Sequence, residues 1–127
     1  SKTASQMFAL ELQKRSDAGG WGITSMAAQP GISRTNLLLN TPGGSGAAGA
    51  ARKLLGFLFQ PVWQGALPTL FAATAPEAKA GGYYGPNGLG ELRGYPAEAS
   101  IPTPARDAET LRRLWAESER LTNTSFP

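Results

Sequence analysis

The first 28 residues combine a helical pattern, a glycine stop and a short apolar segment, and this order strongly constrains the fold. Apolar residues recur at helical spacing between Lys2 and Arg15. The predicted inward face of this helix consists of Ala4, Met7, Phe8 and Leu12. Gly19 and Gly20 are expected to end the helix, because glycine adopts the left-handed C-cap conformation at little cost.

Residues 21–28 are mostly apolar without clean alternation, which predicts a strand buried on both faces of a parallel sheet. A helix closely followed by such a strand is half of a doubly wound unit, so an α/β fold is predicted. Ligands of open parallel sheets bind beyond the carboxyl ends of the strands. The following residues, Gln29, Pro30 and Gly31, are therefore expected to border a site. Proline ends the strand, and glycine lets the backbone pass close to a ligand.

Composition excludes several classes of chemistry. The 127 residues suffice for one domain with one core. The absence of cysteine and histidine excludes disulfides, thiol nucleophiles, serine-histidine-aspartate triads and nearly all zinc sites, so no metal is expected. No apolar run reaches the ~18 residues needed to cross a bilayer, and no signal segment opens the chain. A soluble, cytoplasmic protein without stable membrane insertion is expected.

The formal charge of +3 raises the question of nucleic-acid binding. The basic residues are scattered, however, and are interleaved with acids: Arg112 and Arg113 stand close to Glu109 and Glu117. This pattern is typical of a solvated helix face. No nucleic-acid partner is therefore expected.

Residues 36–60 are predicted to contain a mobile loop. Leu37, Leu38 and Leu39 precede a run of small residues from 41 to 49 that is too flexible for a fixed element. One interpretation is a surface linker with the leucines packed beneath it. Residues 52–59 are apolar with basic residues at one end, a composition that also occurs in helices at membrane surfaces.

A helix is predicted from Pro61 to about Thr74, with a bend at Pro68 because an interior proline removes a backbone hydrogen bond. Its predicted inward residues are Trp63, Leu67, Leu70 and Phe71. Residues 81–86 should follow as a short strand closed by a turn, and the glycines at 85, 88 and 90 are interpreted as part of a turn.

Residues 96–104 are predicted to be irregular, and Asp107 is expected to cap a last helix. The apolar residues of that helix recur at three- and four-residue spacing: Leu111, Leu114, Trp115 and Leu121.

Together, these segments resemble the C-terminal half of a short-chain dehydrogenase/reductase. The resemblance rests on Ser1-Lys2 opening a helix, the short strand, and Pro-Gly-x-x-x-Thr over residues 30–35. It is strongest to the retinol-dehydrogenase-like and protochlorophyllide-reductase-like branch, to which residues 65–74 and 114–119 are similar in sequence. The resemblance implies that residues 1–127 are the C-terminal portion of one Rossmann-type domain, a doubly wound parallel sheet with helices and a lid loop at 36–60. The N-terminal cofactor-binding half would lie outside this chain.

The resemblance also implies roles for individual residues. Lys2 matches the lysine of the Tyr-x-x-x-Lys motif, a catalytic residue that also binds the cofactor ribose, while Ser1 matches the serine that often precedes it. The tyrosine would lie upstream. The cofactor, NAD or NADP, would contact Pro30, Gly31, the backbone of Ile32 and the hydroxyl of Thr35. The implied substrate-binding residues are Leu37, Leu38 and Leu39, which suit an apolar alcohol or carbonyl compound.

The function expected from this resemblance is hydride transfer between NAD(P) and an alcohol or carbonyl compound. This segment alone is expected to be inactive, because activity needs the missing N-terminal half as a partner. A homo-oligomer is compatible with the family. One alternative is a non-catalytic half-fold that serves as a binding or scaffold module. A second alternative, a basic membrane-surface or nucleic-acid binder, rests on the charge and on residues 54–59.

Overall fold

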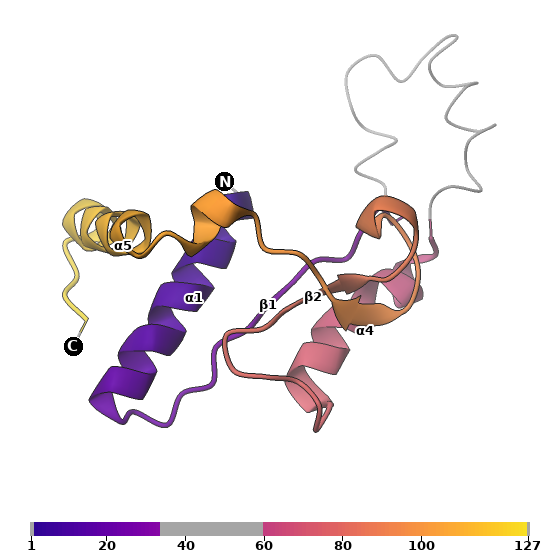
Figure 1. Cartoon of the computed structure of the whole chain (residues 1–127), viewed down its shortest axis with the longest axis horizontal. Helices are drawn as coiled ribbons and strands as arrows, with labels where there is room; N and C mark the ends of the chain where they lie inside the picture. The colour runs from indigo at the N-terminus through magenta and orange to yellow at the C-terminus, as the bar shows by residue number, and fades with distance from the viewer. Residues whose placement is uncertain (1, 34–59, 127) are drawn as a thin grey trace, which may run out of the picture.

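The computed structural model describes residues 2–33 and 60–126, and its architecture is mixed α/β (Figure 1). The elements in chain order are α1 (Lys2–Gly19), β1 (Ala27–Ala28), α4 (Val62–Thr74), β2 (Tyr83–Pro86), the 3-10 helix η2 (Leu89–Glu91), β3 (Pro96–Glu98), the 3-10 helix η3 (Thr103–Arg106) and α5 (Ala108–Thr122). The predicted lid residues 36–59, including the apolar stretch 52–59, lie outside the described residues.

The described residues form a three-stranded sheet in the order β1-β2-β3. β1 and β2 are parallel, with Ala27 opposite Tyr83, whereas β2 and β3 are antiparallel, with Tyr84 opposite Glu98. Because α4 lies between the two parallel strands in sequence, β1, α4 and β2 make a β-α-β unit. In Figure 1 the strands run between α1 and α4.

The central strand β2 is buried along its whole length. The strand expected within residues 81–86 is confirmed as Tyr83–Pro86, and the turn comes after Gly85 and Pro86. Those two residues continue the ladder opposite Ala97 and Pro96, and the chain reverses later, where the Gly88 N–H donates to the Arg93 carbonyl over 2.8 Å. The prediction of irregular structure over 96–104 is wrong, since this segment contains β3 and the start of η3.

The segment before β1 departs from the sequence prediction. Only Ala27–Ala28 is a strand, and most of residues 21–26 are at least partly exposed, so the prediction of a strand buried on both faces is wrong. Side chains of α1 replace the missing strand partners. The Gln13 side chain accepts from the Ser25 N–H over 2.7 Å, and the Ser16 hydroxyl donates to the Ile23 carbonyl over 2.7 Å.

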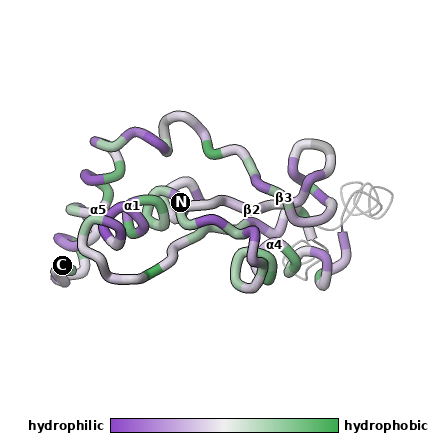
Figure 2. Tube along the Cα trace, turned by 60° about the horizontal axis from the view of Figure 1, so that its bottom comes forward, coloured by the Kyte–Doolittle hydropathy of each residue, from purple (hydrophilic) through white to green (hydrophobic). Residues whose placement is uncertain are grey.

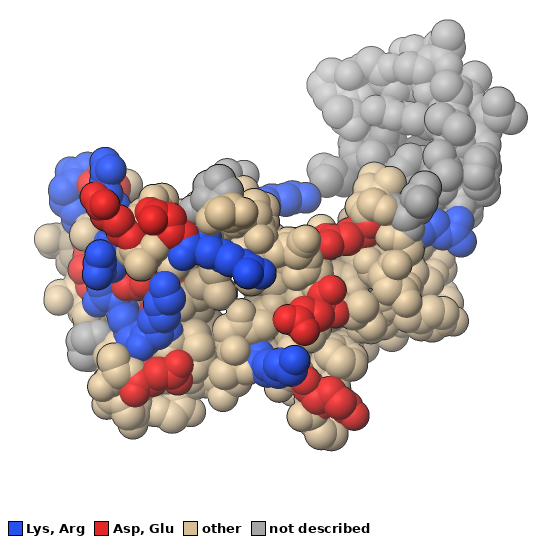
Figure 3. Space-filling model, in the orientation of Figure 1, with Lys and Arg blue, Asp and Glu red and all other residues tan. Residues whose placement is uncertain are grey.

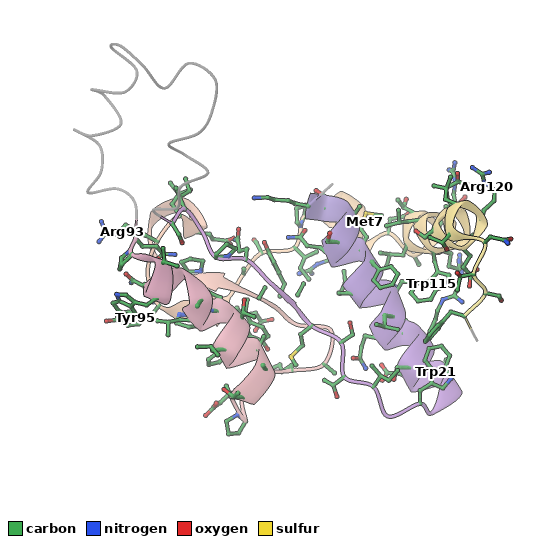
Figure 4. The ribbon with its side chains drawn as sticks, turned by 180° about the vertical axis from the view of Figure 1, so that it is seen from behind. Met7, Trp21, Arg93, Tyr95, Trp115 and Arg120 are labelled. Carbon is green, nitrogen blue, oxygen red and sulfur yellow. The ribbon has the colours of Figure 1, made fainter. Side chains whose placement is uncertain are left out.

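These polar contacts change which face of α1 is buried. The helix itself is confirmed, but its buried residues are Glu11, Gln13 and Ser16. The predicted apolar face is only partly buried, and Phe8 is 43% exposed. Phe8 nevertheless stacks on Trp115 of α5 with ring centroids 4.9 Å apart, and the Arg15 guanidinium lies 4.6 Å from the Trp115 ring centroid. Figure 4 shows Trp115 and Trp21 at this end of the molecule.

Helix α4 buries its small residues rather than its large ones. Gly65 and Pro68 are its buried positions, and the helix continues through Pro68. The predicted inward position of Trp63 and Leu70 is wrong, since these side chains are 61% and 54% exposed. At Gly65 the helix lies against Ser33 and Pro30 of the segment after β1, where a side chain would not fit. Figure 2 colours much of α4 as hydrophobic.

Helix α5 begins where the sequence predicts. Asp107 caps it, and its carboxylate accepts from the Thr110 N–H over 2.8 Å. Leu111 and Trp115 are buried, as their spacing predicts, whereas Leu121 in the last turn is 69% exposed. Basic and acidic side chains are interleaved over the α1 and α5 end in Figure 3. Among the described helices, none is long and apolar enough to cross a membrane.

Truncation of Leu111 tests the packing of α5. Leu111 is 1% exposed, so Leu111→Ala should lower the free energy of unfolding by about 2–5 kcal/mol through lost burial and a cavity. The matched control Leu121→Ala removes a side chain that is 69% exposed and should change that free energy by less than about 0.5 kcal/mol. Urea unfolding measures both. Equal effects would contradict this description of the α5 packing.

The cap of α5 should make stability sensitive to acid. Hydrogen bonds from the Thr110 side chain and then from its backbone hold the pKa of Asp107 below its usual value of 3.8. The stabilisation is therefore complete above pH 3.8 and is lost as the pH falls through the lower folded-state pKa. Asn caps helices as well as Asp does but does not titrate. Asp107→Asn should reduce the fall in urea midpoint between neutral and acidic pH, and an unchanged fall would contradict this origin.

Candidate functional site

Two loops meet at the carboxyl edge of the parallel strands. Residues 29–33 follow β1, and residues 87–95 follow β2. Because β1 and β2 are parallel, their carboxyl ends lie at the same edge of the sheet. This edge is where open α/β sheets bind ligands. The predicted site residues Pro30, Gly31 and Ile32 belong to the first loop.

The loops touch through backbone at Gly31. Its φ of +64° is a conformation that favours glycine. A Cβ at this position would lie 2.5 Å from the Leu92 carbonyl oxygen and 2.7 Å from Pro86 Cγ, so a side chain does not fit. The next residue, Ile32, donates its N–H to the same Leu92 carbonyl over 2.7 Å. The glycine therefore allows close contact between the two loops.

Gln60 joins the two loops through hydrogen bonds. It is 1% exposed and precedes α4 directly. Its backbone N–H donates to the Ile32 carbonyl over 3.1 Å, and its side-chain Nε2 donates to the Pro30 carbonyl. Its Oε1 accepts from the Gly94 N–H over 3.1 Å. Three separate segments of the chain meet at this one amide side chain.

A second polar contact joins the same loops. Gln29 Nε2 donates to the Glu91 carboxylate over 2.6 Å, and the other carboxylate oxygen accepts from the Ser100 N–H over 3.0 Å. Glu91 has a φ of +58°, an uncommon conformation for a residue with a side chain. The sequence analysis missed both Gln60 and Glu91, because an isolated polar residue in a loop carries no periodic signal.

The structure places the remaining predicted site residues as follows. Lys2 is exposed in the first turn of α1, and Figure 1 shows that the start of α1 and the end of β1 point toward the same side of the molecule. Within residues 2–33 and 60–126, no hydrogen bond or ion pair joins Lys2 to the Pro30–Ile32 loop. Thr35 and the leucines 37–39 lie outside the described residues.

β2 carries two buried tyrosines, and the pKa of one of them, Tyr83, is raised. Tyr83 is 7% exposed on β2. Burial raises its pKa above 10.0, a hydrogen bond with the Gln6 side chain partly offsets this, and the nearby Glu91 carboxylate adds to the rise. A general acid or base works best with a pKa near the operating pH. Tyr83 is therefore structural in this arrangement.

A cavity of about 260 Å³ lies away from this edge. Its walls come from α1, the start of β2 and the segment leading into α5, and they include Leu10, Lys14, Tyr83, Arg106 and Leu111. None of the predicted site residues lines it. Among the described residues, no group of three or more carboxylates is arranged to hold a metal ion.

Comparison with known proteins identifies relatives of this chain. No family model matches it. It is 41% identical over 124 residues to a polyprenol dehydrogenase of Mus musculus, covering 96% of this chain and 34% of that protein. It is 37% identical over 120 residues to a short chain dehydrogenase/reductase of Colletotrichum higginsianum, covering 91% of this chain and 27% of that protein. It is 33% identical over 130 residues to human retinol dehydrogenase 13, covering 100% of this chain and 36% of that protein.

A solved structure has a similar fold. The model aligns with the crystal structure of an uncharacterized protein from Mycobacterium paratuberculosis with a TM-score of 0.68 and 32% identity, covering 98% of this chain and 38% of that one. The chain thus spans about a third of the length of the first curated relative. Since the named relatives are dehydrogenases and reductases of one kind, the chain belongs to the short-chain dehydrogenase/reductase family and corresponds to the C-terminal part of its members.

Proposed function

We propose that the protein is an oxidoreductase that transfers a hydride between NAD or NADP and an apolar alcohol or carbonyl compound. The observation that carries this proposal is the Pro30–Ile32 loop at the carboxyl edge of the β1-α4-β2 unit. Family membership supports the reaction class. Residues 1–127 would form the C-terminal portion of a Rossmann-type domain, and cofactor binding would require the rest of that domain.

The loop suits a planar amide such as the nicotinamide carboxamide. The absence of a side chain at Gly31 lets the loop lie against Leu92 and Pro86, which supports its conformation. The Ile32 carbonyl accepts one hydrogen bond, from the Gln60 N–H, and a carbonyl oxygen has a second lone pair that a ligand N–H can use. The Ile32 N–H is engaged with Leu92, so we assign the contact to its carbonyl. Thr35 is proposed as a further contact.

Lys2 is proposed to act through its charge. A bound nicotinamide supplies or accepts the hydride, and a tyrosine four residues before Lys2 would supply or remove the hydroxyl proton. A phenol ordinarily titrates near pH 10, and a neighbouring ammonium favours the phenolate and so lowers its pKa. Lys2 is exposed in the first turn of α1, which leaves its ammonium accessible to the phenol and to the cofactor ribose.

The substrate is proposed to be apolar. The relatives include proteins named for polyprenol and retinol, both apolar alcohols. Leu37, Leu38 and Leu39 are proposed to contact it, within a lid formed by residues 36–59, because the next residue, Gln60, is buried. Leu92, which is 45% exposed beside the site, also favours an apolar substrate. We also propose a cytoplasmic location for the protein.

Replacement of Lys2 tests its catalytic role. In the product of the complete gene, Lys2→Met should lower kcat/KM for alcohol oxidation by about 10²–10⁴-fold, because the phenolate loses its neighbouring charge. Lys14→Met on the same helix is the matched control and should leave kcat/KM unchanged. Steady-state assays of nicotinamide absorbance measure both. Wild-type activity in Lys2→Met would remove Lys2 from the mechanism, and an inactive wild-type protein without cofactor binding would favour a scaffold module instead.

Replacement of Gly31 tests the loop. Gly31→Ala should weaken cofactor binding by about tenfold or more, because the new Cβ displaces the loop from Leu92. Gly20→Ala is a matched control: Gly20 has a similar φ of +65° but nothing within 4 Å of its Cβ position. Both variants place an alanine at a positive φ, but only in Gly31→Ala does the new Cβ collide with Leu92 and Pro86. Equal cofactor affinities, measured by fluorescence titration, would contradict the assignment of this loop.

A further inference from the structure

We propose that Gln60 is a positioning residue that holds the Pro30–Ile32 loop in its cofactor-binding conformation. This inference rests on the proposed function and assigns a role to a residue outside the Pro-Gly-x-x-x-Thr motif. Gln60 contacts the loop at both ends, through the Pro30 and Ile32 carbonyls. Its third bond, from Gly94, connects this loop to the one that follows β2.

The bonding pattern explains why the side chain is an amide. Nε2 must donate to the Pro30 carbonyl while Oε1 accepts from the Gly94 N–H. An amide does both at once, whereas a carboxylate only accepts and a hydrocarbon does neither. Gln60 is 1% exposed, so water does not replace a missing partner. Loss of the amide therefore leaves the Pro30 carbonyl and the Gly94 N–H without partners.

Gln60 also determines the orientation of the Ile32 carbonyl. The Ile32 carbonyl accepts from the Gln60 backbone, so the orientation of this carbonyl depends on where the Gln60 backbone lies. The Gln60 side chain fixes that backbone by bonding to two loops at once. The Ile32 carbonyl is the group assigned above to the nicotinamide carboxamide. Gln60 therefore acts on the cofactor through the loop, without touching it.

Gln64 provides a matched control one turn further along. It lies on α4, is partly buried, and its Nε2 donates to the Gly94 carbonyl over 3.1 Å. It shares Gly94 with Gln60, but within the described part of the chain its side chain makes no hydrogen bond to Pro30 or Ile32. A Gln64 variant thus loses a comparable bond to the second loop and keeps the first loop intact.

The test uses the product of the complete gene and titrates it with NADH and NADPH. Gln60→Leu should raise the Kd for the preferred cofactor about tenfold, while KM for the alcohol changes by less than twofold at saturating cofactor. Gln64→Leu should leave the cofactor Kd within twofold of wild type. A purely structural role for Gln60 predicts a lower melting temperature with an unchanged cofactor Kd, and that result would overturn the proposal.

A second variant covers the case in which Gln60→Leu does not fold. In Gln60→Glu, burial raises the pKa of the new carboxyl, and its protonated form regains an O–H that donates to Pro30 while the other oxygen accepts from Gly94. The ratio of its cofactor Kd to that of wild type should fall toward one as the pH drops from about 8 to about 5. Glu91 and Arg93 on the facing loop are present in both proteins, so the ratio isolates the effect of residue 60.

The outcomes separate this inference from the proposed function. A wild-type protein that binds neither cofactor overturns both. A wild-type protein that binds a cofactor, with Gln60 variants of equal affinity at every pH, overturns only the role of Gln60. A cofactor Kd raised in Gln60→Leu and in Gln60→Glu at high pH, but not in Gln64→Leu, supports it.

Discussion

The pairing of β2 with a strand on each side is the constraint on which the described structure depends. β2 is parallel to β1 and antiparallel to β3, and all four of its residues are buried. The parallel pairing brings the end of β1 beside the end of β2, although the two strands are separated by more than 50 residues of sequence. Without this pairing, residues 29–33 and 87–95 would not form a common edge.

The helices are attached to this sheet by different kinds of contact. α1 holds the segment before β1 through Gln13 and Ser16, whose side chains bond to backbone groups that lack strand partners. α4 buries Gly65 and Pro68, and Gly65 lies against Ser33 and Pro30 of the segment after β1. Both solutions place small or polar groups inside and leave large apolar side chains outside, notably Trp63. Buried polar groups are acceptable here because they are hydrogen-bonded.

The site could be predicted in part from the sequence. The Pro30-Gly31 pair was identified because its residue types and its position after an apolar segment carry a physical meaning, and the structure places it at the sheet edge. Its supports at Gln60, Glu91 and Leu92 could not be predicted. Each support is a contact between residues distant in sequence, such as Gln29 with Glu91, and no local pattern records such a pair.

The sequence by itself determined the elements whose signals are local. The glycine stop after α1, the Asp107 cap of α5 and the buried positions of Leu111 and Trp115 follow from capping chemistry and helical spacing. Only the tertiary structure decided the rest: the length of β1, the continuation of β2 through Pro86, the existence of β3, and the exposed outer face of α4. The physical reason is that strand pairing and burial depend on partners from other parts of the chain, whereas a helix and its caps form from neighbouring residues.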